Sequence, residues 1–256
     1  MTNVRLDIAY NGVGFAGWAA QPGERTVQGE LESALGRVLG ARPSLTVAGR
    51  TDAGVHAWGQ VASFGMEGDP PQTLARAINS LTRDDVTVWS VSAAPEGFDA
   101  RRSARSRTYC YRVLAAPAAS PFERGLSLHW PHRLYPGLLA KCAEAIVGTH
   151  DFTAFTPTQT EHVRFERDVL SAEWRRGRSI GLEHGVETAG AELLEFWVEA
   201  DAFMRSMVRV LVGTMLEVGS GRRPLEEFTS LLGGAPRERA GDTARAHGLY
   251  LASVRY

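Results

Sequence analysis

Strand-like and helix-like patterns of apolar residues alternate along the first part of the chain, and this alternation constrains the fold more than any other feature. Apolar and polar residues alternate where strands are expected, whereas apolar residues recur every three or four positions where helices are expected. The predicted strands are 4–9, 45–48, 60–65 and 86–92, and the predicted helices are 27–39, capped by Thr26, and 70–79, opened by Pro70 and Pro71. The order β-α-β-β-α-β is typical of a split βαβ unit.

The second half of the chain repeats this order of patterns. The predicted strands are 107–114, 167–175, 192–200 and 250–255, and the predicted helices are 136–147 and 203–218. Segments 115–135 and 156–166 contain no clear element and are typical of loops that reach a partner. We therefore expect an α/β (α+β) protein of two related halves, residues 1–104 and 105–256, with a central cleft between them.

Cysteine content and hydropathy exclude several classes of protein. The two cysteines, Cys110 and Cys142, have no short spacing, which argues against a disulfide scaffold or a zinc cluster and is typical of a reduced cytosolic protein. The N-terminus, MTNVRLDIAY, lacks the apolar run of a signal peptide. No apolar stretch approaches the roughly 18 residues needed to span a bilayer. We expect a cytoplasmic protein without a membrane segment.

The type of basic residue is more informative than the net charge, which is −1. Of 28 basic residues, Lys141 alone is lysine and the rest are arginine. Arginine binds phosphate in a bidentate manner and stacks on bases, although a GC-rich genome also enriches arginine. Local clusters of arginine are therefore better evidence for nucleic-acid binding than the overall composition.

The segment AGRTDAGVHA, residues 48–57, combines two glycines with an arginine, an aspartate and a histidine. Gly49 and Gly54 allow left-handed backbone, so composition alone favours a structural turn, with an active-site loop as the alternative. Asp52 and His56 could serve as metal ligands, but no further histidine or acid clusters nearby, and we predict no metal site. The segment also lacks the spacing and the lysine of a phosphate-binding loop.

Arginines and tyrosines are interleaved in residues 98–112, FDARRSARSRTYCYR. On a strand, Arg107, Tyr109 and Tyr111 share one face. This pattern suits RNA, because the charges bind phosphate and a ring can stack on an unpaired base. The alternative is a solvated edge strand whose tyrosines belong to the core.

The predicted helix AFMRSMVRVLVGTMLEVG, residues 202–219, is apolar on nearly all sides but contains Arg205 and Arg209 on one face. A buried guanidinium is costly unless a carboxylate pairs with it. Asp52 and Glu217 are the candidate partners for Arg209. The alternative is that Arg209 extends to the surface along its aliphatic stem.

Several ordered motifs together resemble the tRNA pseudouridine synthase A family. GRTDAGVHA is highly specific, and it occurs with six further segments: FAGWAAQ, TVQGELE, SARSRTYCYRV, DFTAF, AFMRSMVRVLVGTMLEVG and HGLYLASVRY. The resemblance covers the chain from about residue 4 to the C-terminus. It implies the pseudouridine synthase fold, with mostly antiparallel sheets flanking the cleft, and isomerisation of uridine to pseudouridine at positions 38, 39 and 40 in the anticodon stem-loop of tRNA. It also implies a homodimer that binds tRNA and uses no cofactor.

The resemblance assigns roles to individual residues. Asp52 falls on the catalytic aspartate, Tyr109 on the tyrosine that stacks on the target base, and Arg209 on the arginine that pairs with the aspartate. Arg50 and Arg107 are the expected RNA contacts. An aspartate with an ordinary pKa of about 3.9 is ionised at pH 7. Such a carboxylate can attack C1′ or C6, or take a sugar proton to leave a glycal, and the sequence leaves these routes open.

The sequence departs from the family in places that concern RNA contacts. Position 19 is alanine where glutamine is common, position 102 is arginine where an aromatic residue is usual, and residues 157–166 keep little of the usual pattern. Lysines that often bind the tRNA are absent, so arginine must replace them. An RNA-binding module without catalysis and a small-molecule transferase are the rival functions. The intact GRTD segment disfavours the first, and the missing lysine motif disfavours the second.

Overall fold

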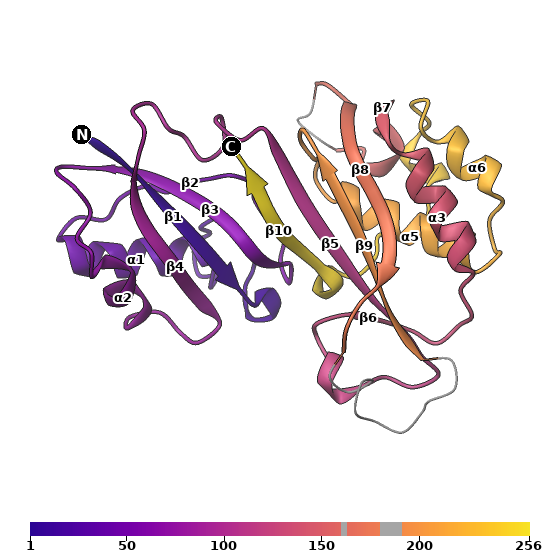
Figure 1. Ribbon diagram of the computed structural model, residues 1–256, viewed down its shortest axis with the longest axis horizontal. Helices are drawn as coiled ribbons and strands as arrows, with labels where there is room; N and C mark the ends of the chain where they lie inside the picture. The colour runs from indigo at the N-terminus through magenta and orange to yellow at the C-terminus, as the bar shows by residue number, and fades with distance from the viewer. Residues whose placement is uncertain (160–162, 180–190) are drawn as a thin grey trace. The chain divides into compact units, whose positions relative to one another are not determined.

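The computed structural model describes residues 1–159, 163–179 and 191–256, which form two compact units. Unit 1 comprises Met1–Arg107 with Tyr250–Tyr256, and unit 2 comprises Thr108–Leu249 (Figure 1). The C-terminal strand therefore groups with the first unit, whereas the sequence patterns placed it in the second half. Each unit combines a sheet with helices, so the predicted α+β class is confirmed.

Unit 1 contains a mostly antiparallel sheet with the strand order β4-β1-β3-β10, in which β2 also pairs with β3. Its strands are β1 (Thr2–Tyr10), β2 (Thr46–Val47), β3 (His56–Met66), β4 (Val86–Ala94) and β10 (Leu249–Arg255). β10 runs parallel to β3, with Tyr250 opposite His56 and Leu251 opposite Ala57. β3 begins earlier than the sequence indicates, so His56 lies on a strand rather than in a loop.

Two helices, α1 (Val27–Leu39) and α2 (Leu74–Asn79), contribute to the core of unit 1. Leu31 and Leu35 of α1 are fully buried, as are the alternate residues of β1. The Thr26 hydroxyl accepts a hydrogen bond from Gly29 N at 3.2 Å, and α1 ends at Gly40 with φ 77°. The predicted helix 27–39 is thus confirmed at both ends, while α2 begins later than predicted.

Unit 2 contains a sheet with the strand order β5-β9-β8-β7, and β6 pairs in parallel with β5. Its strands are β5 (Ser106–Ala115), β6 (Leu128–Trp130), β7 (Gly148–Asp151), β8 (Glu166–Arg176) and β9 (Glu192–Ala200). Its helices are α3 (Pro136–Ala145), α5 (Met207–Gly219) and α6 (Leu225–Ser230). Helix α3 contacts β8, α5 and α6, and the three helices lie side by side in Figure 1.

Unit 2 differs from the predicted elements in two respects. The short strands β6 and β7 were not predicted, because three or four residues are too few to establish a period. Helix α5 begins at Met207 rather than at 203, because Ser206 has a left-handed backbone with φ 58°. Arg205 therefore precedes the helix, and the prediction that it shares a helical face with Arg209 is wrong. Residues 160–162 of the predicted loop 156–166 lie outside the described residues.

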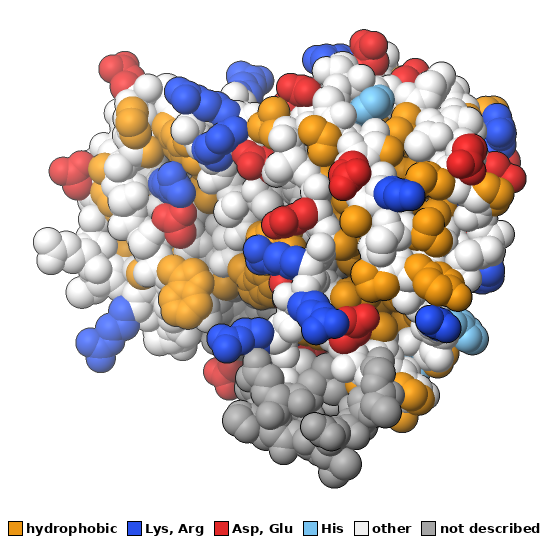
Figure 2. All heavy atoms as spheres, turned by 45° about the vertical axis from the view of Figure 1, so that its right-hand side comes forward, with side chains coloured by type: hydrophobic (Ala, Val, Ile, Leu, Met, Phe, Trp, Pro, Cys, Tyr) orange, Lys and Arg blue, Asp and Glu red, His pale blue; other side chains and the backbone are white. Residues whose placement is uncertain are grey.

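The charges on the face drawn in Figure 2 do not mark out a binding surface. Figure 2 shows basic and acidic side chains interspersed over one face, without a broad patch of either sign. This distribution agrees with the net charge of −1. Within the described part of the chain, no helix is both long enough and apolar enough to cross a membrane.

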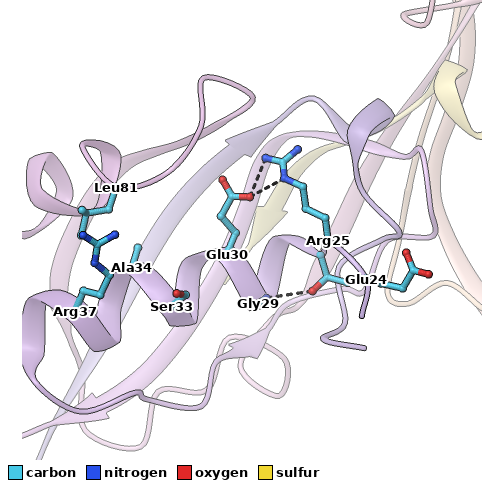
Figure 3. A pocket seen from close by; sticks show the side chains of 9 residues that line it. Glu24, Arg25, Gly29, Glu30, Ser33, Ala34, Arg37 and Leu81 are labelled. Atoms are coloured by element: carbon cyan, nitrogen blue, oxygen red, sulfur yellow. Dashed lines mark hydrogen bonds and ion pairs between the residues drawn. The ribbon is translucent and has the colours of Figure 1, made fainter. Parts of the chain in front are cut away.

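Arg25, directly before α1, connects two parts of unit 1. Its Nη1 and Nη2 each donate to an oxygen of Asp85 at 2.7 Å, and its Nε donates to Glu30 Oε2 at 2.8 Å. Figure 3 shows Arg25 and Glu30 turned toward each other at the edge of a small cavity of about 200 Å³. The hydrogen bonds from Arg25 are the main reason why the pKa of Asp85 is lower than its ordinary value.

We expect Arg25→Met to lower the urea midpoint of unfolding at pH 7, by the equivalent of about 1 kcal/mol. Because the folded-state pKa of Asp85 is depressed, the ion pair stabilises the protein above the ordinary aspartate pKa and is lost as the pH falls through the folded-state value. The deficit of the variant should therefore shrink between pH 7 and pH 3.5. Arg42→Met, which removes an exposed partner of Glu32, is the control. An equal deficit at both pH values would contradict this explanation.

Candidate active site

Asp52 lies half-buried in the loop that connects β2 to β3. Val55 N donates to Asp52 O at 3.1 Å, and Gly54 has φ 79°, so a tight turn follows directly after the aspartate. On its other side, Trp18 N donates to Thr51 O at 3.0 Å. The backbone is therefore held immediately before and shortly after the carboxylate.

The segment 15–18 (FAGW) packs directly against this loop. Gly54 N donates to Phe15 O at 3.3 Å. Gly17 has φ 103°, and a Cβ at this position would lie 2.9 Å from Thr51 O. Only glycine therefore allows the two backbones to approach so closely. The two motifs are far apart in sequence but form one structural element.

A buried polar network holds the loop from the sheet side. Tyr10 OH and Thr51 Oγ1 lie 2.8 Å apart, and Gln60 Nε2 donates to Tyr10 OH at 3.2 Å and to Gly49 O at 2.8 Å. Burial raises the pKa of Tyr10 to about 12, so its hydroxyl stays protonated at neutral pH. Each of these polar groups has a partner, which is the condition under which a buried network is rigid.

His56 has a packing role in the structure. Its side chain is fully buried, and its Nδ1 accepts a hydrogen bond from Gly12 N at 3.1 Å. Its ring stacks on Tyr250, with centroids 4.4 Å apart and planes 14° apart. Among the described residues, no three His, Cys, Asp or Glu side chains gather where they could hold a metal ion, and this includes Asp52 and His56.

The two arginines expected to contact RNA differ in their surroundings. Arg50, two residues before Asp52, is exposed. Arg107 is half-buried, and its Nη2 donates to Ala48 O at 2.9 Å and to Arg101 O at 2.8 Å. Its Nη1 donates to Ala104 O at 3.2 Å. Arg107 therefore connects the arginine-rich turn 99–105 to the end of β2, beside the Asp52 loop.

Tyr109 and Tyr111 lie on β5 and have different partners in unit 2. Tyr109 is buried, and its ring meets Phe203 edge-to-face at 4.9 Å. Tyr111 OH donates to Arg245 O at 2.7 Å, and burial raises the pKa of Tyr111 above its ordinary value. Tyr111 thus anchors the loop that precedes β10.

Arg209 lies half-buried on the first turns of α5, and it contacts the same loop. Its Nε donates to Ala244 O at 2.8 Å, while Ala244 N donates to Arg209 O at 3.1 Å. Glu217, one of the two predicted partners, instead pairs with Arg223 through an oxygen 2.9 Å from Nη2. Eight residues of helix separate Glu217 from Arg209, or about 12 Å along the axis.

Sequence reasoning did not find the residues that hold the Asp52 loop, namely Tyr10, Gln60 and Trp18. Each occupies a position that periodicity assigns to a strand or a loop without indicating its hydrogen-bond partner. The one available signal was the presence of FAGWAAQ as a separate motif. The motif indicated that this segment matters for the family, but it did not indicate that the segment packs against the Asp52 loop.

Comparisons with known proteins agree over almost the whole chain. The family described as tRNA pseudouridine synthase matches residues 8–101 and 142–256. "tRNA pseudouridine synthase A" of Frankia casuarinae is 45% identical over 260 residues, which covers 100% of this chain and 90% of that protein. Proteins with the same name from Bacillus pumilus and Myxococcus xanthus are 37% and 38% identical, covering 99% and 100% of this chain and 98% and 92% of the relatives. This chain therefore belongs to the tRNA pseudouridine synthase family.

Proposed function

We propose that this protein isomerises uridine to pseudouridine at positions 38, 39 and 40 in the anticodon stem-loop of tRNA, with Asp52 as its catalytic nucleophile and without a cofactor. The family to which it belongs converts uridine to pseudouridine in tRNA. The observation that carries the assignment of Asp52 is the loop itself, whose backbone is hydrogen-bonded on both sides of the aspartate. Such preorganisation is what a group positioned for catalysis requires.

The chemistry needs a carboxylate and a well-held base. The C1′–N1 glycosidic bond breaks, the detached uracil turns, and a C5–C1′ bond forms. C5 then loses its proton, and N1, which no longer bonds to C1′, gains one from solvent. There is no net oxidation or reduction. A carboxylate can serve by attacking C1′ or C6, or by taking a sugar proton. In each route Asp52 acts in its ionised form, and Tyr109 holds the base by stacking.

We assign the remaining residues to orientation and RNA binding. Arg209 pairs with Asp52, and the engagement of Glu217 by Arg223 supports this choice between the two predicted carboxylates. Arg50 contacts the RNA backbone directly, because its side chain is exposed next to the catalytic loop. The positive charge of Arg107 attracts the RNA backbone, while its hydrogen-bond donors hold the 99–105 turn in place.

The protein is proposed to act in the cytoplasm as a homodimer with tRNA bound across both subunits. The resemblance to the tRNA pseudouridine synthase A family supports this assembly. Sedimentation velocity of the purified chain, with and without tRNA, measures the subunit number directly.

We expect wild-type protein to release tritium from tRNA labelled at uridine C5, and Asp52→Ala to release none while still binding the tRNA. The reason is that the variant lacks the carboxylate but keeps the surrounding RNA contacts. Asp84→Ala removes an exposed carboxylate of the same unit and should behave as wild type. Equal release by Asp52→Ala and wild type would exclude Asp52 as the catalytic group, and no release by any of the three would favour a binding module.

We expect Arg209→Met to fold and bind tRNA but to have a kcat lower by about 10- to 100-fold, because an unoriented carboxylate loses its productive geometry. Arg205→Met changes an exposed arginine before the same helix and should retain kcat. Single-turnover tritium release separates the chemical step from binding. Full activity of Arg209→Met would refute the ion pair with Asp52.

A further inference from the structure

The loop that connects β4 to β5 contains a turn, residues 99–105, with three exposed arginines. These are Arg101, Arg102 and Arg105, and within the described part of the chain none of the three forms an ion pair with a carboxylate. Asp99 is the only acidic residue of the turn. The turn is therefore locally positive, although the net charge of the whole chain is −1.

The side chain of Asp99 holds the backbone of this turn. Its Oδ1 accepts hydrogen bonds from Arg101 N at 2.9 Å and from Arg102 N at 2.8 Å. Ser103 N donates to Asp99 O at 2.9 Å, and Asp99 N donates to Ser103 Oγ at 3.1 Å. An aspartate that bonds to the backbone two residues further on stabilises a turn in this way. Asp99 therefore determines the shape of the segment that contains the arginines.

The 99–105 turn is also fixed to the sheet of unit 1. Ala100 is fully buried, its N donates to Ser63 Oγ at 3.0 Å, and its O accepts from Tyr256 OH at 2.9 Å. Arg105 N donates to Arg255 O at 2.8 Å. Figure 1 shows the loop between β4 and β5 running beside the C-terminal end of β10. The exposed arginine side chains thus extend from a backbone that is already ordered.

Two contacts place the 99–105 turn at the start of the Asp52 loop. Arg107 Nη2 donates both to Ala48 O at 2.9 Å and to Arg101 O at 2.8 Å. Ala48 and Ala100 belong to the same buried apolar cluster. Asp52 follows Ala48 by four residues, so its Cα lies at most about 14 Å from that of Ala48. The turn and the aspartate are therefore neighbours within unit 1.

This arrangement suits the backbone of a nucleic acid. One strand of a helix carries a phosphate about every 3.4 Å, so 14 Å corresponds to about four nucleotides. Each guanidinium can bind a phosphate through two parallel hydrogen bonds, and it remains charged at any physiological pH. Because Lys141 is the only lysine of the chain, arginines must make almost all of the phosphate contacts.

We propose that the 99–105 turn is a preformed phosphate-binding element, in which Arg101, Arg102 and Arg105 bind the RNA backbone close to the uridine that Asp52 modifies. The inference rests on the proposed function, since it assumes that the tRNA lies along the Asp52 loop. The hydrogen bonds of Asp99 reduce the entropy that is lost when the arginines bind. The three arginines position the RNA and take no part in bond breaking.

The main test replaces the three arginines by glutamine, singly and together, with the exposed Arg76 of α2 as the control. We expect each single variant to raise the Kd for an unmodified tRNA transcript about three- to tenfold and to lower the slope of log Kd against log salt by about one. The single-turnover rate at saturating tRNA should change less. Arg76→Gln should bind as wild type does. A Kd of the triple variant within about twofold of wild type would overturn the proposal.

Two substitutions of Asp99 separate the shape of the turn from its charge. Asp99→Asn and Asp99→Ala both remove one negative charge, but only asparagine keeps an oxygen that can accept from the two backbone N–H groups. We expect Asp99→Asn to bind tRNA at least as tightly as wild type and Asp99→Ala to bind it more weakly than Asp99→Asn. A Kd of Asp99→Ala equal to or below that of Asp99→Asn would show that the turn is not preformed for binding.

A neutral phosphate analogue locates the contact. In a stem-loop RNA with one methylphosphonate linkage, wild type should lose affinity at each linkage that an arginine contacts, and the matching glutamine variant should lose no more. If none of the linkages within about four nucleotides of the target uridine behaves in this way, the proposal is wrong. Absence of tritium release by wild type would refute the proposed function, while the Kd and its salt dependence would still decide whether the turn binds RNA.

Discussion

The shape of the Asp52 loop depends on hydrogen bonds to a separate segment, residues 15–18, more than on bonds within the loop. Two glycines make this possible, because Gly17 allows the backbones to touch and Gly54 allows the chain to turn back after the aspartate. The hydroxyl pair of Tyr10 and Thr51 supports the loop from the sheet below. The carboxylate thus belongs to a rigid scaffold, although the loop that contains it is rich in glycine.

Regular elements with a long apolar pattern could be predicted from the sequence. The bounds of helix 27–39 were predicted to the residue, since its N-cap and its stripe of apolar residues are both visible in the sequence. The bounds of strand 192–200 were also predicted to the residue. The short strands β6 and β7 could not be predicted, because their pairing depends on neighbours distant in the chain. The start of α5 was misplaced because helix propensity gives no warning of a left-handed serine at 206.

The candidate site was predictable only in part. The motif GRTDAGVHA singles out Asp52, but the contacts that hold it join residues 41 and 50 positions apart, such as Thr51 and Gln60 with Tyr10. The period of the apolar pattern assigns a residue to one face of a strand or helix, but it does not identify the residue's hydrogen-bond partner. The same limit applies to Glu217, whose pairing with Arg223 needs the turn after α5.

Arg107 stabilises the fold through short hydrogen bonds and can act on a charged ligand through its longer-range electrostatic field. Its donors bond to the carbonyl oxygens of Ala48, Arg101 and Ala104, and these hydrogen bonds hold the turn 99–105 against the end of β2. Such a cation still contributes to the field around the loop, and that field decays over roughly 8–10 Å at physiological salt. An arginine of this kind attracts a polyanion during its approach and accelerates encounter, whereas the lifetime of the complex depends on side chains that touch the RNA.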